Sequence, residues 1–172
     1  MVKNPARIIV LLALCLFIPV PAMGAEVRVI ASDDSGVTVE VNGLDYSLRP
    51  VVSNGIRYQA LSIPGGVNAP NEGQPDVSVV SAILGIPFGT DVGLEIVDGT
   101  YIEVNDIHLL PAPGVDDTGQ IASYDADPDA YASNSWFPAE QASITRVGQI
   151  RDQRVAAVSL SPIQYSPGES KM

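Results

Sequence analysis

The sequence predicts an all-β domain, a β-sandwich of about eight or nine short strands with a long irregular loop near residues 111–141. The chain has 15 Gly and 14 Pro among its 172 residues. They are spread between short apolar runs, as in a turn-rich β domain, rather than gathered in one block. Apolar residues alternate along several of these runs, and no long stretch has the spacing of an amphipathic helix.

The first predicted strand covers residues 37–41 (VTVEV), where three valines face one side and the Thr and Glu face the other. Asn42-Gly43 follows it and is a strong hairpin-turn signal. Ser53-Asn54-Gly55 is a second turn signal, and residues 56–63 after it are predicted to form a strand.

Residues 77–86 (VSVVSAILGI) form a nearly continuous apolar run. Such a run predicts a strand that is buried on both faces. A buried helix is the alternative, but Pro75 and Pro87 bracket the run closely and favour the strand.

Further alternation is present at Val92, Leu94 and Ile96. Asp98-Gly99 then predicts a turn into a strand at residues 101–110, which would complete a second hairpin. A last pair of strands is predicted at residues 142–150 and 154–160.

Residues 111–141 are rich in Pro, Gly, Asp, Ala and Ser and contain no obvious strand of their own. A loop of this length is unusual in a compact domain, so it is either functional or packed irregularly on the sheets. Its aromatic residues indicate that parts of it are held in place: Tyr124, Tyr131, Trp136 and Phe137.

The start of the chain has the features of a signal peptide. Lys3 and Arg7 supply a positive region, and an apolar run follows at residues 8–17 (IIVLLALCLF). That run is too short to span a bilayer, which needs about 20 residues. Cys15, the single cysteine, lies inside the run, so the mature chain would have neither a disulfide nor a thiolate nucleophile.

Small residues end this segment, and cleavage after Gly24 or after Ala25 would fit. The chain then divides into a signal peptide at 1–25, a domain at 26–168 and a tail at 169–172. We expect the product to be secreted, periplasmic or at the cell surface, with no attachment to the membrane after cleavage.

The mature chain is strongly acidic. The sequence has nine Lys and Arg, two of which lie in the signal peptide, against 20 Asp and Glu, so the mature net charge is near −13. This charge argues against binding to nucleic acid or to anionic membranes, since both require clustered Lys or Arg. It favours solubility or a basic partner.

No catalytic constellation is present in the sequence. His108 is the single histidine, and no cysteine is left to pair with it after signal cleavage. Neither a G-x-S-x-G elbow, nor an H-E-x-x-H motif, nor a phosphate-binding loop occurs. We therefore expect no enzymatic activity from this chain alone, and no cofactor.

An acidic run, DADPD, offers one weak candidate for a metal site. Asp125, Asp127 and Asp129 have the spacing that opens a calcium loop. Ala130 and Trp136 stand where an EF-hand needs its Gly and its bidentate Glu, so an EF-hand is excluded. An irregular calcium site and a plain acidic surface loop remain as the two interpretations.

Three stretches occur together in an informative order. The first is GQPDVSVVS at 73–81, followed by ILGIPFG at 83–89. The second is Trp136-Phe137-Pro138 after Tyr131, and the third covers residues 146–167 and ends in SPIQYSP. In this order, over roughly residues 57–167, the chain resembles the propeptides of gingipain-type (family C25) cysteine peptidases. Ser78 stands where that family usually has Pro.

The resemblance implies a β-sandwich prodomain that assists the folding of a cysteine peptidase catalytic domain and occupies its cleft, in cis or in trans. The catalytic His–Cys pair belongs to that peptidase domain, which these 172 residues do not contain, so no catalytic residue is carried over. Such a prodomain can place a basic side chain in a specificity pocket, and Lys171 would suit a processing site. The basic residues of the mature chain are Arg28, Arg49, Arg57, Arg146, Arg151, Arg154 and Lys171.

A second function remains open from the sequence, a stand-alone secreted β-sandwich module for adhesion or carbohydrate binding. It would need an exposed aromatic platform. Tyr131, Trp136 and Phe137 form the one aromatic cluster available for that purpose.

Overall fold

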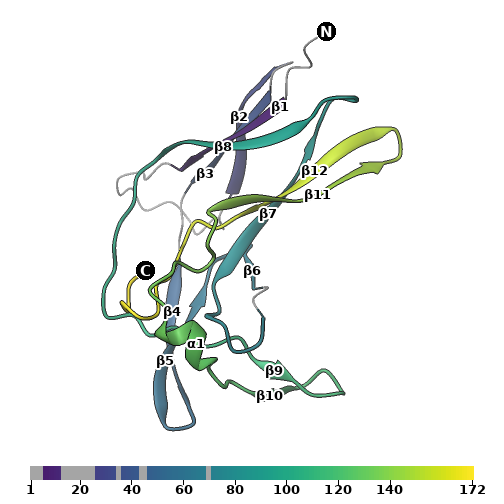
Figure 1. Ribbon diagram of the computed structural model, residues 1–172. Helices are drawn as coiled ribbons and strands as arrows, with labels where there is room; N and C mark the ends of the chain where they lie inside the picture. Colours follow the sequence, from purple (N-terminus) through teal and green to yellow (C-terminus); the bar gives the residue numbers. More distant parts are fainter. Residues whose placement is uncertain (1–5, 13–25, 34–35, 43–45, 69–70) are drawn as a thin grey trace.

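The computed structural model describes residues 6–12, 26–33, 36–42, 46–68 and 71–172 (Figure 1). These residues form two four-stranded sheets, two two-stranded sheets and one short helix. The all-β prediction is confirmed. The described residues form twelve strands, more than the expected number, because several elements of two or three residues are too short to show alternation.

The first large sheet has the strand order β2-β3-β1-β8. Strand β2 pairs antiparallel with β3, whereas β1 is parallel to both β3 and β8. The predicted alternation of residues 37–41 holds, since Val39 and Val41 are fully buried. The bounds are Ala6–Leu12 for β1, Glu26–Asp33 for β2, Gly36–Asn42 for β3 and Val92–Gly99 for β8.

The second large sheet is antiparallel throughout, with the order β11-β12-β7-β6. Strands β11 and β12 form the predicted last hairpin, which projects from the body of the domain (Figure 1). The bounds are Val67–Asn68 for β6, Ser78–Gly85 for β7, Ala142–Ile150 for β11 and Gln153–Leu160 for β12.

A shared hydrophobic cluster joins the two large sheets. Val39 and Val41 of β3 belong to one buried cluster with Leu84 of β7 and with Ala156 and Val158 of β12. Burying apolar side chains between two facing sheets is the arrangement of a β-sandwich.

Strand β7 departs from its prediction, because one of its faces is exposed. Ser78, Val80 and Leu84 are buried, but Ile83 keeps 65% of its surface exposed. The expectation of burial on both faces was wrong. The sheet packs against the other large sheet on one side only. Because the apolar run does not alternate with polar residues, the sequence does not show which face of β7 is exposed.

A separate hairpin is formed by β4 (Ser47–Ser53) and β5 (Ile56–Ser62). Its turn confirms the predicted signal, since Asn54 and Gly55 both have positive φ, at 51° and 77°. Positive φ at both central residues is the requirement of a type I′ turn. The other predicted turn, at Asn42-Gly43, lies partly outside the described residues.

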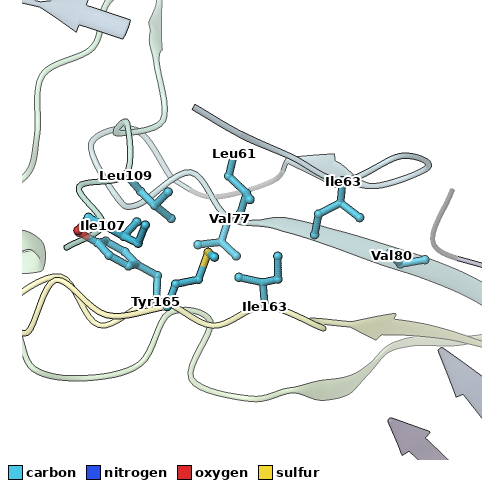
Figure 2. Packing of buried hydrophobic residues seen from close by; sticks show 9 residues of the cluster. Leu61, Ile63, Val77, Val80, Ile107, Leu109, Ile163 and Tyr165 are labelled. Carbon is cyan, nitrogen blue, oxygen red and sulfur yellow. The ribbon is translucent and has the colours of Figure 1, made fainter. Parts of the chain in front are cut away.

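A second hydrophobic cluster joins β5 and β7 to the end of the chain (Figure 2). Tyr165 is fully buried in it, beside Leu109 and Ile163. Met172, which is 8% exposed, belongs to the same cluster. The remaining members are Leu61, Ile63, Val77, Val80 and Ile107.

Residues 101–110 do not form the predicted hairpin strand. The backbone of Val104 exchanges two hydrogen bonds with Met172, at 2.8 and 2.9 Å, and Gln59 is bonded to His108 and Leu110. This segment therefore runs extended between β5 and the chain end. One isolated bridge, between Leu109 and Gln59, and backbone hydrogen bonds to the chain end take the place of a single strand partner. The apolar residues of the segment are buried: Ile107, Leu109 and Leu110.

Residues 111–141 are more ordered than predicted. They contain strands β9 (Gly114–Val115) and β10 (Ile121–Ser123) and the helix α1 (Pro128–Ala132). The prediction of a loop without a strand was wrong because elements of two to five residues are shorter than the periods that reveal strands and helices. No helix in the described part of the chain has the length and apolar character needed to cross a membrane.

Candidate functional site

The hairpin β9–β10 projects from the lower part of the domain (Figure 1). Its turn is held by the side chain of Asp116, whose Oδ1 accepts hydrogen bonds from the backbone N–H groups of Thr118 (2.8 Å) and Gln120 (2.9 Å). The hydroxyl of Thr118 donates a third bond to the same oxygen. Gly119 adopts a φ of 80°. The turn is thus fixed by its own side chains before any partner binds.

These hydrogen bonds also set the charge of the turn. The bond from the Thr118 hydroxyl, followed by the backbone N–H donors of Gln120 and Thr118, holds the pKa of Asp116 below its ordinary value. The carboxylate is therefore ionised at neutral pH and stays an acceptor for all three donors.

Two apolar side chains flank this turn. Val115 and Ile121 are cross-strand partners, so their side chains lie on the same side of the hairpin. They are 63% and 57% exposed. Sequence reasoning missed this hairpin, although the Asp-Asp-Thr-Gly turn at 116–119 between two apolar residues was a usable signal.

The base of the hairpin is anchored to the segment that opens the first family-like motif. The N–H of Ala112 donates to the carbonyl of Gln74 (2.7 Å), and the N–H of Gly73 donates to the carbonyl of Ala112 (3.1 Å). Pro75 and Pro111 form an antiparallel bridge beside them. The GQP stretch therefore positions the strand that leads into β9.

The chain that leaves the hairpin after β10 is anchored by the acidic run DADPD. Asp127 caps α1, because its side chain accepts hydrogen bonds from the N–H groups of Asp129 and Ala130, and its own N–H donates to Gly73. Oδ1 of Asp125 accepts a bond from Asn54 at the β4–β5 turn. Among the described residues no group of three His, Cys, Asp or Glu side chains could hold a metal ion. Asp125 and Asp127 thus act structurally, and the calcium hypothesis gains no support.

His108 is exposed and packs between two tyrosines. Its ring centroid lies 4.6 Å from that of Tyr58 and 6.0 Å from that of Tyr131. Its Nδ1 lies 3.2 Å from the carbonyl oxygen of Arg57. This arrangement orders the lower end of the domain and places no nucleophile beside the imidazole.

The three aromatic residues that suggested a glycan platform have different surroundings. The hydroxyl of Tyr131 donates to the carbonyl of Leu109 at 2.7 Å, and burial raises the pKa of this tyrosine. The backbone of Phe137 pairs with that of Tyr165. Trp136, 41% exposed, is the most exposed of the three. Tyr131 and Phe137 are half-buried, so the three rings are not all exposed as a glycan platform would require.

Two of the basic residues, Arg154 and Lys171, are each held by contacts within the domain. Nη1 of Arg154 donates to the carbonyl oxygens of Pro87 (3.1 Å) and Thr90 (2.6 Å), so it ties β12 to the loop after β7. Nζ of Lys171 lies 3.7 Å from carboxylates of both Glu103 and Glu169. The backbone of Lys171 is bonded to Ser166. The predicted processing site, and with it the predicted tail, is therefore held against the domain.

The carboxyl group of Asp76 is partly buried, and its burial is costly when it is ionised. Its Oδ1 is buried without a hydrogen-bond partner among the described residues. Desolvation raises the pKa of Asp76 above 3.8, and a hydrogen bond from Asn68 offsets part of that shift. A raised pKa in the folded state favours the protonated form, so stability is lost as the pH rises through this pKa.

Replacing Asp76 with Asn is expected to raise the free energy of unfolding by about 1 kcal/mol at pH 7, because a buried charge is removed. The gain should vanish near pH 3, where the wild-type carboxyl is protonated in both states. Urea unfolding of both proteins at the two pH values measures it. Asp152→Asn, at the exposed β11–β12 turn, is the control for net charge, and an equal gain from it would refute the burial argument.

Comparison with known proteins gives consistent matches. Residues 22–172 match the family model described as Propeptide_C25. Gingipain R2 of Porphyromonas gingivalis is 25% identical over 146 residues, which are 83% of this chain and 20% of that protein. Lys-gingipain HG66 of the same species is 22% identical over 129 residues, which are 70% of this chain and 8% of that protein. The chain thus spans about a fifth or less of these curated relatives.

Two solved structures share the fold. One is the complex of the RgpB pro- and mature domains of Porphyromonas gingivalis, with a TM-score of 0.77 and 25% identity over 84% of this chain and 76% of that chain. The other, described as giving insight into the zymogenic latency of gingipain K from that species, has a TM-score of 0.51 and 20% identity, and the match covers 73% of each chain.

Proposed function

Because the chain belongs to the Propeptide_C25 family, we propose that it keeps a C25-type cysteine peptidase inactive and assists its folding, in cis or in trans. The solved relative in which a pro-domain is in complex with its mature domain supports this proposal. So does the zymogenic latency named for gingipain K. The catalytic chemistry lies in the peptidase domain. We also propose that residues 1–25 direct export, which would place the complex outside the cytoplasm.

The observation that carries the proposal is the β9–β10 hairpin. It projects from the domain, its turn is fixed by Asp116, and it exposes Val115 and Ile121 on one side. An extended segment that is ordered before binding loses little conformational entropy when it enters a cleft. We infer that this hairpin, rather than one of the arginines, is the part that occupies the peptidase cleft.

The composition of the hairpin fits this role. Residues 114–123 (GVDDTGQIAS) contain neither Lys nor Arg. A peptidase that cuts after basic residues would therefore find no cleavable bond in the segment that occupies its cleft, so the hairpin would block the site without being consumed.

The test is inhibition by the purified full chain of a C25 peptidase from the same organism, with the mature domain of Gingipain R2 as a second probe. The wild-type chain should inhibit, and Val115→Glu should raise the inhibition constant at least about tenfold, since an apolar contact is replaced by a charge that must lose its water. The measurement is residual peptidase activity against chain concentration.

Val52→Glu on the β4–β5 hairpin is the matched control, because Val52 is also an exposed hairpin valine, at 67%. It should inhibit like the wild type. Absence of inhibition of either peptidase by the wild-type chain would overturn the proposed function, and equal losses from the two variants would overturn the role of the hairpin.

A further inference from the structure

We propose that residues 166–172 form a latch, and that a peptidase selective for lysine cuts after Lys171 only when this latch has come away from the domain. Cleavage adds one water molecule across the Lys171–Met172 peptide bond, leaving a carboxylate on Lys171 and an amine on Met172. Protection of this bond is separate from inhibition, since it does not depend on how the cleft of a peptidase is filled.

The residue after the bond is held by the segment at 104–107. The N–H of Met172 donates to the carbonyl of Val104 at 2.9 Å, and its carbonyl accepts from the N–H of Val104 at 2.8 Å. The N–H of Ile107 donates to the carbonyl of Ser170 at 3.0 Å. The side chain of Met172 is 8% exposed and belongs to the second hydrophobic cluster. Freeing the bond therefore also exposes an apolar side chain.

The backbone before the bond is folded on itself. The N–H of Lys171 donates to the carbonyl of Ser166 at 3.1 Å, and the N–H of Ser166 donates to the carbonyl of Lys171 at 2.8 Å. Between them Ser170 has a φ of 52°. A peptide is recognised as an extended strand through its free backbone groups. The latch meets neither condition while it is closed.

The side chain of Lys171 adds a smaller obstacle. Its Nζ lies 3.7 Å from a carboxylate oxygen of Glu103 and 3.7 Å from one of Glu169. A specificity pocket that takes up the whole side chain must break both ion pairs. Because ion pairs with this much solvent exposure contribute little, the backbone hydrogen bonds and the burial of Met172 provide most of the protection.

The helix α1 supports the latch from another side, and the chain end lies near it (Figure 1). The N–H of Gly168 donates to the carbonyl of Ser133 at 2.9 Å. A Cβ at Gly168 would lie 3.0 Å from that oxygen and 3.1 Å from the carbonyl oxygen of Ala132. It would be closest to the side-chain oxygen of Asn134. A methyl group at Gly168 should thus loosen the latch and leave Lys171 and its two neighbours unchanged.

These contacts set the expected rate of cleavage. Chain ends are normally easy to cut, because they are seldom tied down by hydrogen bonds and burial. When a held segment opens and closes quickly, its rate of cleavage follows the population of the open form. We expect the folded chain to be cut after Lys171 at least about 100-fold more slowly than the unfolded chain.

The test uses the full chain with a short Gly-Ser tail added after Met172, so that a peptidase has residues to bind on both sides of the bond. A lysine-specific endopeptidase is added to the native chain and to the chain unfolded in urea. The sequence has two lysines, Lys3 and Lys171, so loss of the tail in mass spectra reports one bond. Both rates are corrected for the activity of the endopeptidase on a short peptide in the same buffer.

Two glycine variants show whether the latch is responsible. Gly168→Ala should raise the native rate at least about tenfold, because the open form becomes more populated. Gly148→Ala is the matched control, since nothing lies within 4 Å of a Cβ added there, and it should leave the rate unchanged. The free energy of global unfolding of each variant is measured in urea.

Three results would overturn the latch. The first is equal cleavage of the native and the unfolded wild-type chain. The second is an equal rise in rate from the two glycine variants. The third is a rise from Gly168→Ala no larger than its loss of global stability accounts for, because the whole fold and not the latch would then protect the bond. None of these results depends on inhibition of a C25 peptidase, so the proposed function stands or fails separately.

Discussion

Replacing Tyr165 with Ala is expected to lower the free energy of unfolding by roughly 3–5 kcal/mol, which is a large part of the stability of a domain of this size. The side chain is completely buried, and it contacts residues from β5, β7 and the segment at 101–110 (Figure 2). Its hydroxyl donates a hydrogen bond to the carbonyl of Ile107 at 3.0 Å. The substitution therefore leaves both a cavity and an unpaired buried carbonyl.

Tyr165→Phe separates these two losses. It keeps the ring and removes the hydroxyl, so a cost of only about 1 kcal/mol is expected from the lost bond to Ile107. Urea unfolding followed by tryptophan fluorescence measures both variants. If Tyr165→Ala lowers the free energy of unfolding no more than Tyr165→Phe does, packing of the Tyr165 ring in the second hydrophobic cluster does not stabilise the domain.

Replacing Gly73 with Ala is expected to cost about 2–3 kcal/mol of unfolding free energy. Gly73 has a φ of 79°, which is unfavourable for any residue with a Cβ. A Cβ there would also lie 3.0 Å from the backbone nitrogen of Asp127 and 3.1 Å from the carbonyl oxygen of Asp125. These are backbone atoms, so they cannot swing away as a side-chain end would.

Gly55→Ala provides the matched control. Gly55 has nearly the same φ, 77°, but nothing lies within 4 Å of an added Cβ. It should cost only about 1 kcal/mol, from backbone conformation alone. The difference between the two variants, measured as the shift in the urea midpoint, reports the close packing of the 73–77 segment on the acidic run. Equal shifts would show that this packing is loose.

The sequence predicted the sandwich well where β-branched residues alternate. Residues 37–41 became β3 with its valines inward, and the final hairpin was placed within one residue of β11 and β12. These strands are long enough for a period of two to be seen. The turn at Asn54-Gly55 was predictable because only certain residues accept positive φ at both positions.

Other features depend on contacts that the sequence does not display. The outward face of β7 has the same apolar composition as its inward face, so whether a second layer covers it is decided by the rest of the fold. The DADPD run resembled metal ligands, yet Asp127 caps a five-residue helix and Asp125 holds a distant turn. The family-like order of motifs pointed to the function sooner than any single residue did.

Strand β1 bears on how the protein is best produced. It lies between β3 and β8 and pairs with both, yet it is formed by residues 6–12, ahead of the predicted cleavage point. Cleavage at the proposed point removes this strand from the exported protein as well as from a recombinant chain that begins at residue 26, so β3 and β8 must then pair directly or expose two edges to solvent. Open strand edges recruit other chains. Concentration-dependent aggregation of such a product would then report a missing strand, and a short peptide with the sequence ARIIVLL is the additive to try first.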